Sequence, residues 1–202
     1  MLLGKREGVN FGQKGRQTSQ GEKPGPPSAQ FYWTYSQKEG SIMKTPIVDR
    51  DLTKQPPHSP RERFGGFAIL ARTVDKCRAS IAGNLGEYHF DCPLDNQLFS
   101  FKGINGDQFK AAVASCQNYE DAAAWLQQTG VPKSPGEIMA WSDQVEAVRL
   151  KDIPTLQEPD RKKEVTESCR KLGLEFEEAT LFEWLETDDE ASFQPQPQMA
   201  EH

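Results

Sequence analysis

The chain has 202 residues, a hydrophobic fraction of 36% and a formal net charge of −6. This length suits one domain, and the low hydrophobic fraction indicates that part of the chain is not packed. The acidic excess is concentrated in residues 151–202. An acidic chain is a poor candidate for general nucleic-acid binding, so we do not expect a nucleic-acid partner.

The bulk features also bear on location. No apolar run approaches the roughly 18 residues that a membrane span requires, and the N-terminal residues lack the apolar segment of a secretory signal. The four cysteines lie far apart and form no CxxC pair, a spacing typical of reduced thiols rather than of a zinc site. We therefore expect a cytoplasmic protein without a membrane contact or a metal site. No motif indicates a cofactor.

Residues 1–48 are predicted to form a disordered extension, because Gly, Gln, Lys and Ser dominate them. The aromatic run at residues 31–35 departs from this composition, and one interpretation is a docking peptide. The other is an over-extended reading frame, with Met43 as the true start. A Gln- and Pro-rich tail over residues 194–202 is also predicted to be disordered.

Residues 49–193 carry the pattern of an all-α domain. A Pro-rich, extended arm leads to Gly65-Gly66, and apolar residues then recur at helical spacing. The inward-facing positions of this helix are predicted to be Phe67, Leu70, Val74, Cys77 and Ile81. Its charged residues Arg72, Asp75 and Lys76 lie off that apolar stripe.

Capping residues and glycine stops predict the later helices. They are expected to begin at Pro93, Asp107, Asn118, Ser134, Asp160 and Thr180. Residues 87–92 fit either a short strand or an irregular bridge, residues 154–159 a hinge, and residues 188–190 the approach to the tail. We therefore predict a compact, single-domain, all-α bundle of about six helices with flexible tails.

Several long motifs also point to a known family. They read DLTKxPPxSPR from Asp51, DKxRAxIAG from Asp75, GEYHFxCPLD from Gly86 and SPxEIxAW from Ser134, and Phe182, Trp184 and Asp188-Asp189 follow. Over roughly residues 49–193 the sequence resembles the bacterial domain of unknown function 5069 family. That family has no established activity, so the resemblance implies no catalytic or binding residue.

The first candidate site is a run of cations beside a helix start. Backbone N–H groups at such a start, together with arginine forks, bind phosphate or carboxylate well. We expect a small anionic ligand, or a partner of unknown identity, to bind without catalysis at Arg61, Arg63, Arg72, Lys76, Arg78, Tyr88 and His89. The competing interpretation is that these cations form surface salt bridges with nearby carboxylates.

The alternative function is an enzyme of the hydrolase or transferase type. His89 would act as a base beside Asp95, or with Cys92 as the nucleophile. A half-buried structural histidine explains the same residues without catalysis, so the sequence leaves the question open. The acidic, aromatic segment at residues 175–190 fits either a helix for a partner protein or a terminal helix that packs on its own domain.

Overall fold

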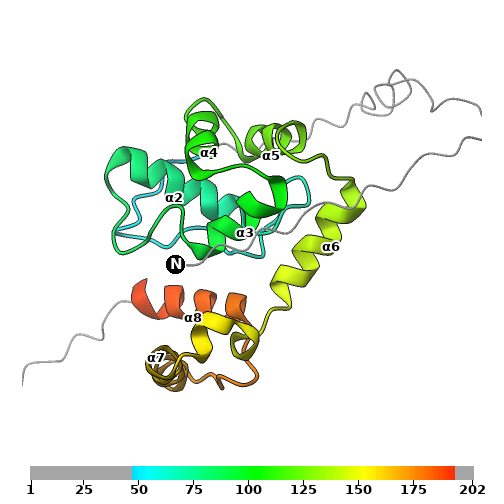
Figure 1. The fold of residues 1–202 in the computed structure, drawn as a ribbon. Helices are drawn as coiled ribbons and strands as arrows, with labels where there is room; N and C mark the ends of the chain where they lie inside the picture. Colours follow the sequence, from blue (N-terminus) through cyan, green and yellow to red (C-terminus); the bar gives the residue numbers. More distant parts are fainter. Residues whose placement is uncertain (1–46, 194–202) are drawn as a thin grey trace, which may run out of the picture. The chain divides into compact units, whose positions relative to one another are not determined.

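The computed structural model describes residues 47–193 (Figure 1). The predicted extension and C-terminal tail therefore lie almost wholly outside the described residues. The described part contains seven α-helices, two short 3₁₀ helices and no strand, which confirms the all-α prediction. In chain order these are α2 (Leu70–Ala82), α3 (Pro93–Lys102), α4 (Gly106–Val113), α5 (Tyr119–Gln128), α6 (Pro135–Glu146), η2 (Leu150–Asp152), η3 (Pro154–Gln157), α7 (Pro159–Lys171) and α8 (Leu181–Phe193).

Helix α2 is the centre of the main hydrophobic core. Four of its five predicted inward positions, Phe67, Leu70, Val74 and Cys77, are fully buried against α3, α4 and α5. The prediction for Ile81 is wrong, because this side chain is 50% exposed at the end of the helix. The stripe therefore identifies the helix correctly but extends one turn too far.

The charged side chains of α2 are buried as well. Arg72, Asp75 and Lys76 are each at most 3% exposed, although they lie off the apolar stripe. The reason is that α2 is covered on its polar side by the Pro-rich arm, by the start of α3 and by α8, which supply partners for the charges.

The start of α2 is set by a tight loop rather than by Gly65-Gly66 alone. Ile69 has a left-handed backbone (φ 69°), which is strained for a β-branched residue. Ser142 of α6 holds this loop: its hydroxyl accepts a hydrogen bond from the Ala68 N–H (2.9 Å) and donates one to the Gly66 carbonyl (2.8 Å). The helix therefore begins only at Leu70.

Helix α8 lies alongside the beginning of α2. Phe182 is fully buried in a small cluster with Ala68, Ile69 and Val145. A separate cluster around Cys169 of α7 packs this helix against Leu181 and Trp184 of α8. Figure 1 shows α7 and α8 below the group formed by α2–α5, joined to it by α6. This packing leaves a cleft between α8 and α2.

The capping signals locate most helix starts. Asn118 caps α5, and Ser134 and Glu137 form the predicted capping box of α6. Helix α4 is capped by Asn105 rather than by Asp107. Helix α8 continues to Phe193, so it is longer than the short helix predicted after Thr180 and includes residues 188–190. The predicted hinge contains the 3₁₀ helix η3.

Candidate functional site

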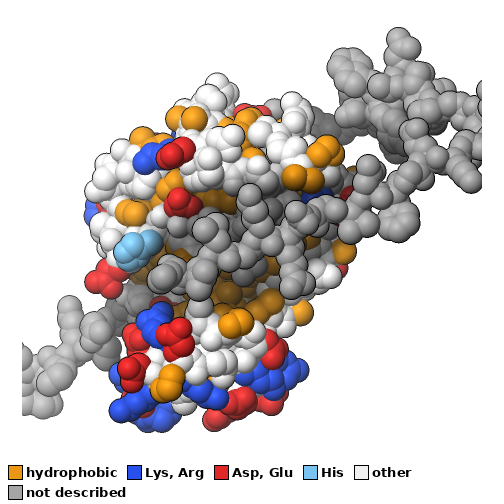
Figure 2. Space-filling model, viewed as in Figure 1, with side chains coloured by type: hydrophobic (Ala, Val, Ile, Leu, Met, Phe, Trp, Pro, Cys, Tyr) orange, Lys and Arg blue, Asp and Glu red, His pale blue; other side chains and the backbone are white. Residues whose placement is uncertain are grey.

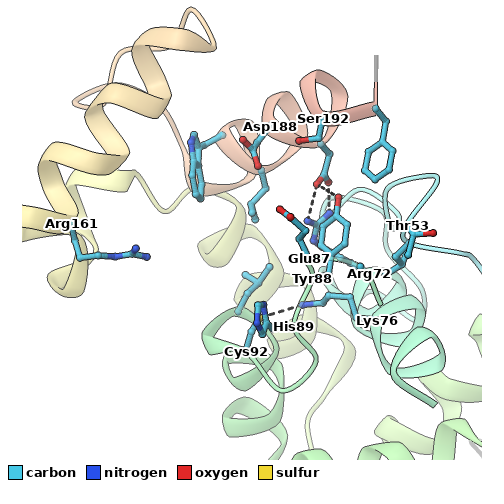
Figure 3. Close-up of a pocket in the computed structure, with 17 residues that line it drawn as sticks. Thr53, Arg72, Lys76, Glu87, Tyr88, His89, Cys92, Arg161, Asp188 and Ser192 are labelled. Atoms are coloured by element: carbon cyan, nitrogen blue, oxygen red, sulfur yellow. Dashed lines mark hydrogen bonds and ion pairs between the residues drawn. The ribbon is translucent and has the colours of Figure 1, made fainter. Parts of the chain in front are cut away.

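The candidate site is a cleft of about 850 Å³, a volume within the range of small-ligand pockets. Helix α2, the irregular segment of residues 84–92 and helix α8 form its walls (Figure 3). The apolar part of the lining consists of Leu52, Leu94, Trp184, Leu185 and Phe193. The polar part consists of Thr53, Arg72, Lys76, Glu87, Tyr88, His89, Cys92, Arg161, Asp188, Asp189 and Ser192.

One wall carries a three-donor clamp on a carboxylate. Arg72 Nη1 and Nη2 donate to the two oxygens of Asp189 at 2.6 and 3.3 Å, and the Tyr88 hydroxyl donates to Asp189 Oδ1 at 2.7 Å. The Arg72 guanidinium also lies over the Tyr88 ring, 5.6 Å from its centroid. Burial, followed by the charge and hydrogen bond of Asp189, raises the pKa of Tyr88. Its hydroxyl therefore stays protonated and acts as a donor.

A second buried cation lies next to this clamp. Lys76 Nζ is 2.8 Å from Asp95 Oδ1 and donates to Cys92 Sγ at 3.2 Å. Asp95 is fully buried and also accepts hydrogen bonds from the Thr73 hydroxyl and the Cys92 N–H. Asp95 therefore ties α2 to the beginning of α3. It is not open to the cleft, whereas Cys92 lines it.

The remaining charges of the cleft are less constrained. Asp188 is half-buried, and within residues 47–193 it has no hydrogen-bond or ion-pair partner. Burial raises its pKa, and the neighbouring charge of Asp189 adds to the rise. Glu87 and His89 are exposed on the rim, and Arg161 of α7 enters from the other side while bonded to Glu164.

The cleft brings together four of the seven predicted anion-binding residues: Arg72, Lys76, Tyr88 and His89. The other three lie elsewhere, and each is paired. Arg61 contacts Glu146 and Glu186, and Arg63 contacts Asp143 and Glu146.

The third, Arg78, pairs with Asp49. The seven residues thus do not form one site. Of the predicted catalytic candidates, His89 and Cys92 line the cleft, but within the described residues no hydrogen bond joins His89 to Cys92 or to a carboxylate.

A second polar network, around Asp75, was not predicted from the sequence. Its carboxylate accepts hydrogen bonds from the His58 N–H and Nδ1 at 2.8 and 2.6 Å and from the Tyr119 hydroxyl at 2.6 Å. Arg50 Nη2 donates to His58 Nε2 at 3.1 Å. Every polar atom of this histidine ring is thus engaged, and the network fastens the Pro-rich arm to α2 and α5. His58 lies in that arm without any motif that would have pointed to it.

Cationic and anionic side chains are interspersed on the described surface (Figure 2). On the face seen in Figure 2, outside the area that grey residues cover, Lys and Arg side chains alternate with Asp and Glu over α7 and α8. Among the described residues, no group of three or more His, Cys, Asp or Glu is placed to hold a metal ion. No helix of residues 47–193 is long and apolar enough to cross a membrane.

The family model described as Domain of unknown function (DUF5069) matches residues 54–191. The chain therefore belongs to this family, as the motifs from Asp51 onward indicated. No curated protein matches the chain.

Proposed function

We propose that this member of the DUF5069 family is a small-ligand-binding module without catalysis, and that its ligand carries an anionic group. The observation that carries the proposal is the clamp of Arg72 and Tyr88. Three donors from two different segments converge on one carboxylate at the wall of a cleft. Such a forked arginine with a hydroxyl donor is well suited to carboxylate and phosphate groups.

In the structure the protein's own Asp189 occupies this clamp. We propose that the ligand's carboxylate or phosphate replaces Asp189 there. Its apolar part would lie against Trp184, Leu185 and Leu94, which line the same cleft. The carboxylates of Glu87 and Asp188 disfavour a highly charged anion. They favour a ligand that has one anionic group together with an amine, such as an amino acid derivative.

The test is a thermal-shift screen of the full chain against small carboxylates, phosphates, amino acids and simple amines. A ligand at a hundred times its Kd adds about 2.7 kcal/mol, which corresponds to a shift of several degrees. The shift should vanish in Arg72→Lys, because a lysine keeps the charge but loses the fork. It should shrink in Tyr88→Phe and remain in the control Arg78→Lys, which changes an arginine outside the cleft.

Two results would refute the proposal. One is a panel in which no anionic compound shifts the melting temperature. The other is an anion response that survives in Arg72→Lys at full size, because the clamp would then not be the binding site. Responses to amines alone would show that Glu87 and Asp188 define the ligand instead.

We further propose that the protein is bacterial and acts in the cytoplasm. The support for a reducing compartment is that all four cysteines, at positions 77, 92, 116 and 169, are free. Fractionation of cells that express the native chain would test this location. Recovery of the protein outside the cytoplasm would contradict it.

A further inference from the structure

The wall of the cleft also contains two nucleophilic side chains in direct contact. Lys76 of α2 and Cys92 at the start of α3 come from different elements, and Nζ lies 3.2 Å from Sγ (Figure 3). Lys76 is 3% exposed and is held in place by Asp95. The sulfur is therefore next to an amine whose position is fixed by a buried ion pair.

Cys92 differs from the other three cysteines in its surroundings. Burial raises the pKa of the thiols of Cys77, Cys116 and Cys169, and none of these three lines the cleft. Cys92 is partly exposed at the cleft and is in contact with an ammonium group. Partly exposed cysteines in electropositive surroundings are the ones that peroxides oxidise.

We propose that Cys92 and Lys76 form an oxidative modification site, in which hydrogen peroxide converts the pair into a covalent sulfur–nitrogen cross-link. This inference does not depend on the proposed ligand. The link would join α2 to the start of α3 covalently, and it would therefore fix one wall of the cleft. A thiol reductant would reverse it.

The chemistry balances in two steps. First, the Cys92 sulfur attacks one oxygen of hydrogen peroxide, the O–O bond breaks, and the products are a sulfenic acid and one water molecule. The sulfur is oxidised by two electrons and the peroxide is reduced. Second, the Lys76 ammonium, which lines the cleft, releases a proton to the water of the cleft.

The free amine then attacks the sulfur. The N–S bond forms, the S–O bond breaks, and the hydroxyl leaves as water with a second proton from nitrogen. A sulfenic acid is known to condense with a backbone nitrogen to a sulfenamide, and the Lys76 amine would be the nucleophile in the same reaction here. The net change in the protein is the loss of two hydrogen atoms.

The experiment treats the full wild-type chain with hydrogen peroxide, blocks free thiols, and measures the intact mass and the peptide map. After the mass of the blocking groups is subtracted, we expect a loss of about 2 Da, which matches a sulfenamide, and a cross-linked peptide pair that contains Lys76 and Cys92. Dithiothreitol should restore the original map. This readout requires no variant, so it does not depend on the folding of a mutant.

Two variants identify the partners. The Lys76→Arg variant keeps the positive charge but lacks the nucleophilic amine. Its oxidation should therefore stop at a sulfenic acid on Cys92, which dimedone traps. Cys92→Ser should show neither product. A disulfide of Cys92 with another cysteine also removes two hydrogens, but the peptide map distinguishes it. A wild-type map in which Cys92 forms a disulfide, is over-oxidised or stays unmodified, with no link to Lys76, overturns the proposal.

Discussion

Replacement of Asp189 by alanine should destabilise the protein strongly and make it responsive to small carboxylates. The side chains of Arg72 and Asp189 are 3% and 10% exposed, so the pair is buried. Removal of one partner from a buried pair costs about 3–5 kcal/mol. The adjoining cleft admits water to the freed guanidinium, so we expect the lower end of that range. For a domain of this size, about 3 kcal/mol lowers the melting temperature by roughly 6–12 °C.

The cavity left by the lost carboxylate should accept acetate or formate. With acetate at ten times its Kd, the variant should regain about 1.4 kcal/mol, measured by denaturant unfolding at constant ionic strength. Chloride at the same ionic strength is the first control. The second is Asp188→Ala, because this neighbouring carboxylate has no hydrogen-bond or ion-pair partner among the described residues. This variant should neither lose as much stability nor respond to acetate. A cost below about 1 kcal/mol, in the range of an exposed pair, or an equal response to acetate and chloride, would refute the reasoning.

Three further substitutions test other parts of the fold. Asp188→Asn should be more stable than the wild type near neutral pH, because the folded pKa of Asp188 lies above its ordinary value of 3.8 and ionisation therefore disfavours folding. Urea unfolding measures the gain, which should disappear below pH 3.8, where the carboxyl is protonated in both the folded and the unfolded chain. Ser142→Ala should cost about 2–3 kcal/mol in the same assay, since it leaves a buried N–H and a partly buried carbonyl unpaired. Gly130→Ala should lower the melting temperature by several degrees, because the added Cβ would overlap the Lys102 carbonyl and φ is +70°.

The local patterns of the sequence predict most of the helices. A 3-4 spacing of apolar residues needs only the helical repeat to be read, and it identifies α2 through Phe67, Leu70, Val74 and Cys77. Capping boxes are equally local, because both partners lie within four residues, as at Ser134 and Glu137. Boundaries fail where a distant group acts. The start of α2 depends on Ser142 of α6, 74 residues from the Ala68 N–H that it binds.

The candidate site was harder to predict because its charges pair over long sequence distances. Arg72 and Asp189 are 117 residues apart, and Tyr88 and Asp189 are 101 apart. A cationic side chain that lies off the apolar stripe of a helix is normally predicted to be exposed to solvent. The burial of Arg72 and Lys76 could therefore not be predicted from the local sequence. By contrast, the contact between Cys92 and the buried Asp95 could be predicted from the sequence, because the two residues are only three positions apart and the Cys92 N–H donates to the Asp95 carboxylate.

One ion pair joins α8 to the segment that precedes α2, and a second joins α8 to α2 itself. Glu186 and Asp189 are three residues apart on one face of α8, and they bind Arg61 and Arg72 respectively. The Arg61–Glu186 pair is partly exposed and adds little net stability, but a shifted helix would leave the buried charge of Arg72 unpaired. We infer that they fix the register of α8, while the burial of Phe182 supplies much of the docking free energy.

This division of roles links the docking of α8 to the proposed binding. A ligand that takes the place of Asp189 removes one of the two register contacts but leaves Glu186 and Phe182 engaged, so α8 should loosen at its C-terminal half while its first turn stays in place. Amide hydrogen exchange in Asp189→Ala measures this directly. Faster exchange confined to the residues after Glu186 supports the link. Faster exchange along the whole of α8 would mean that Asp189 holds the entire helix, and that an anionic ligand cannot displace it without undocking α8.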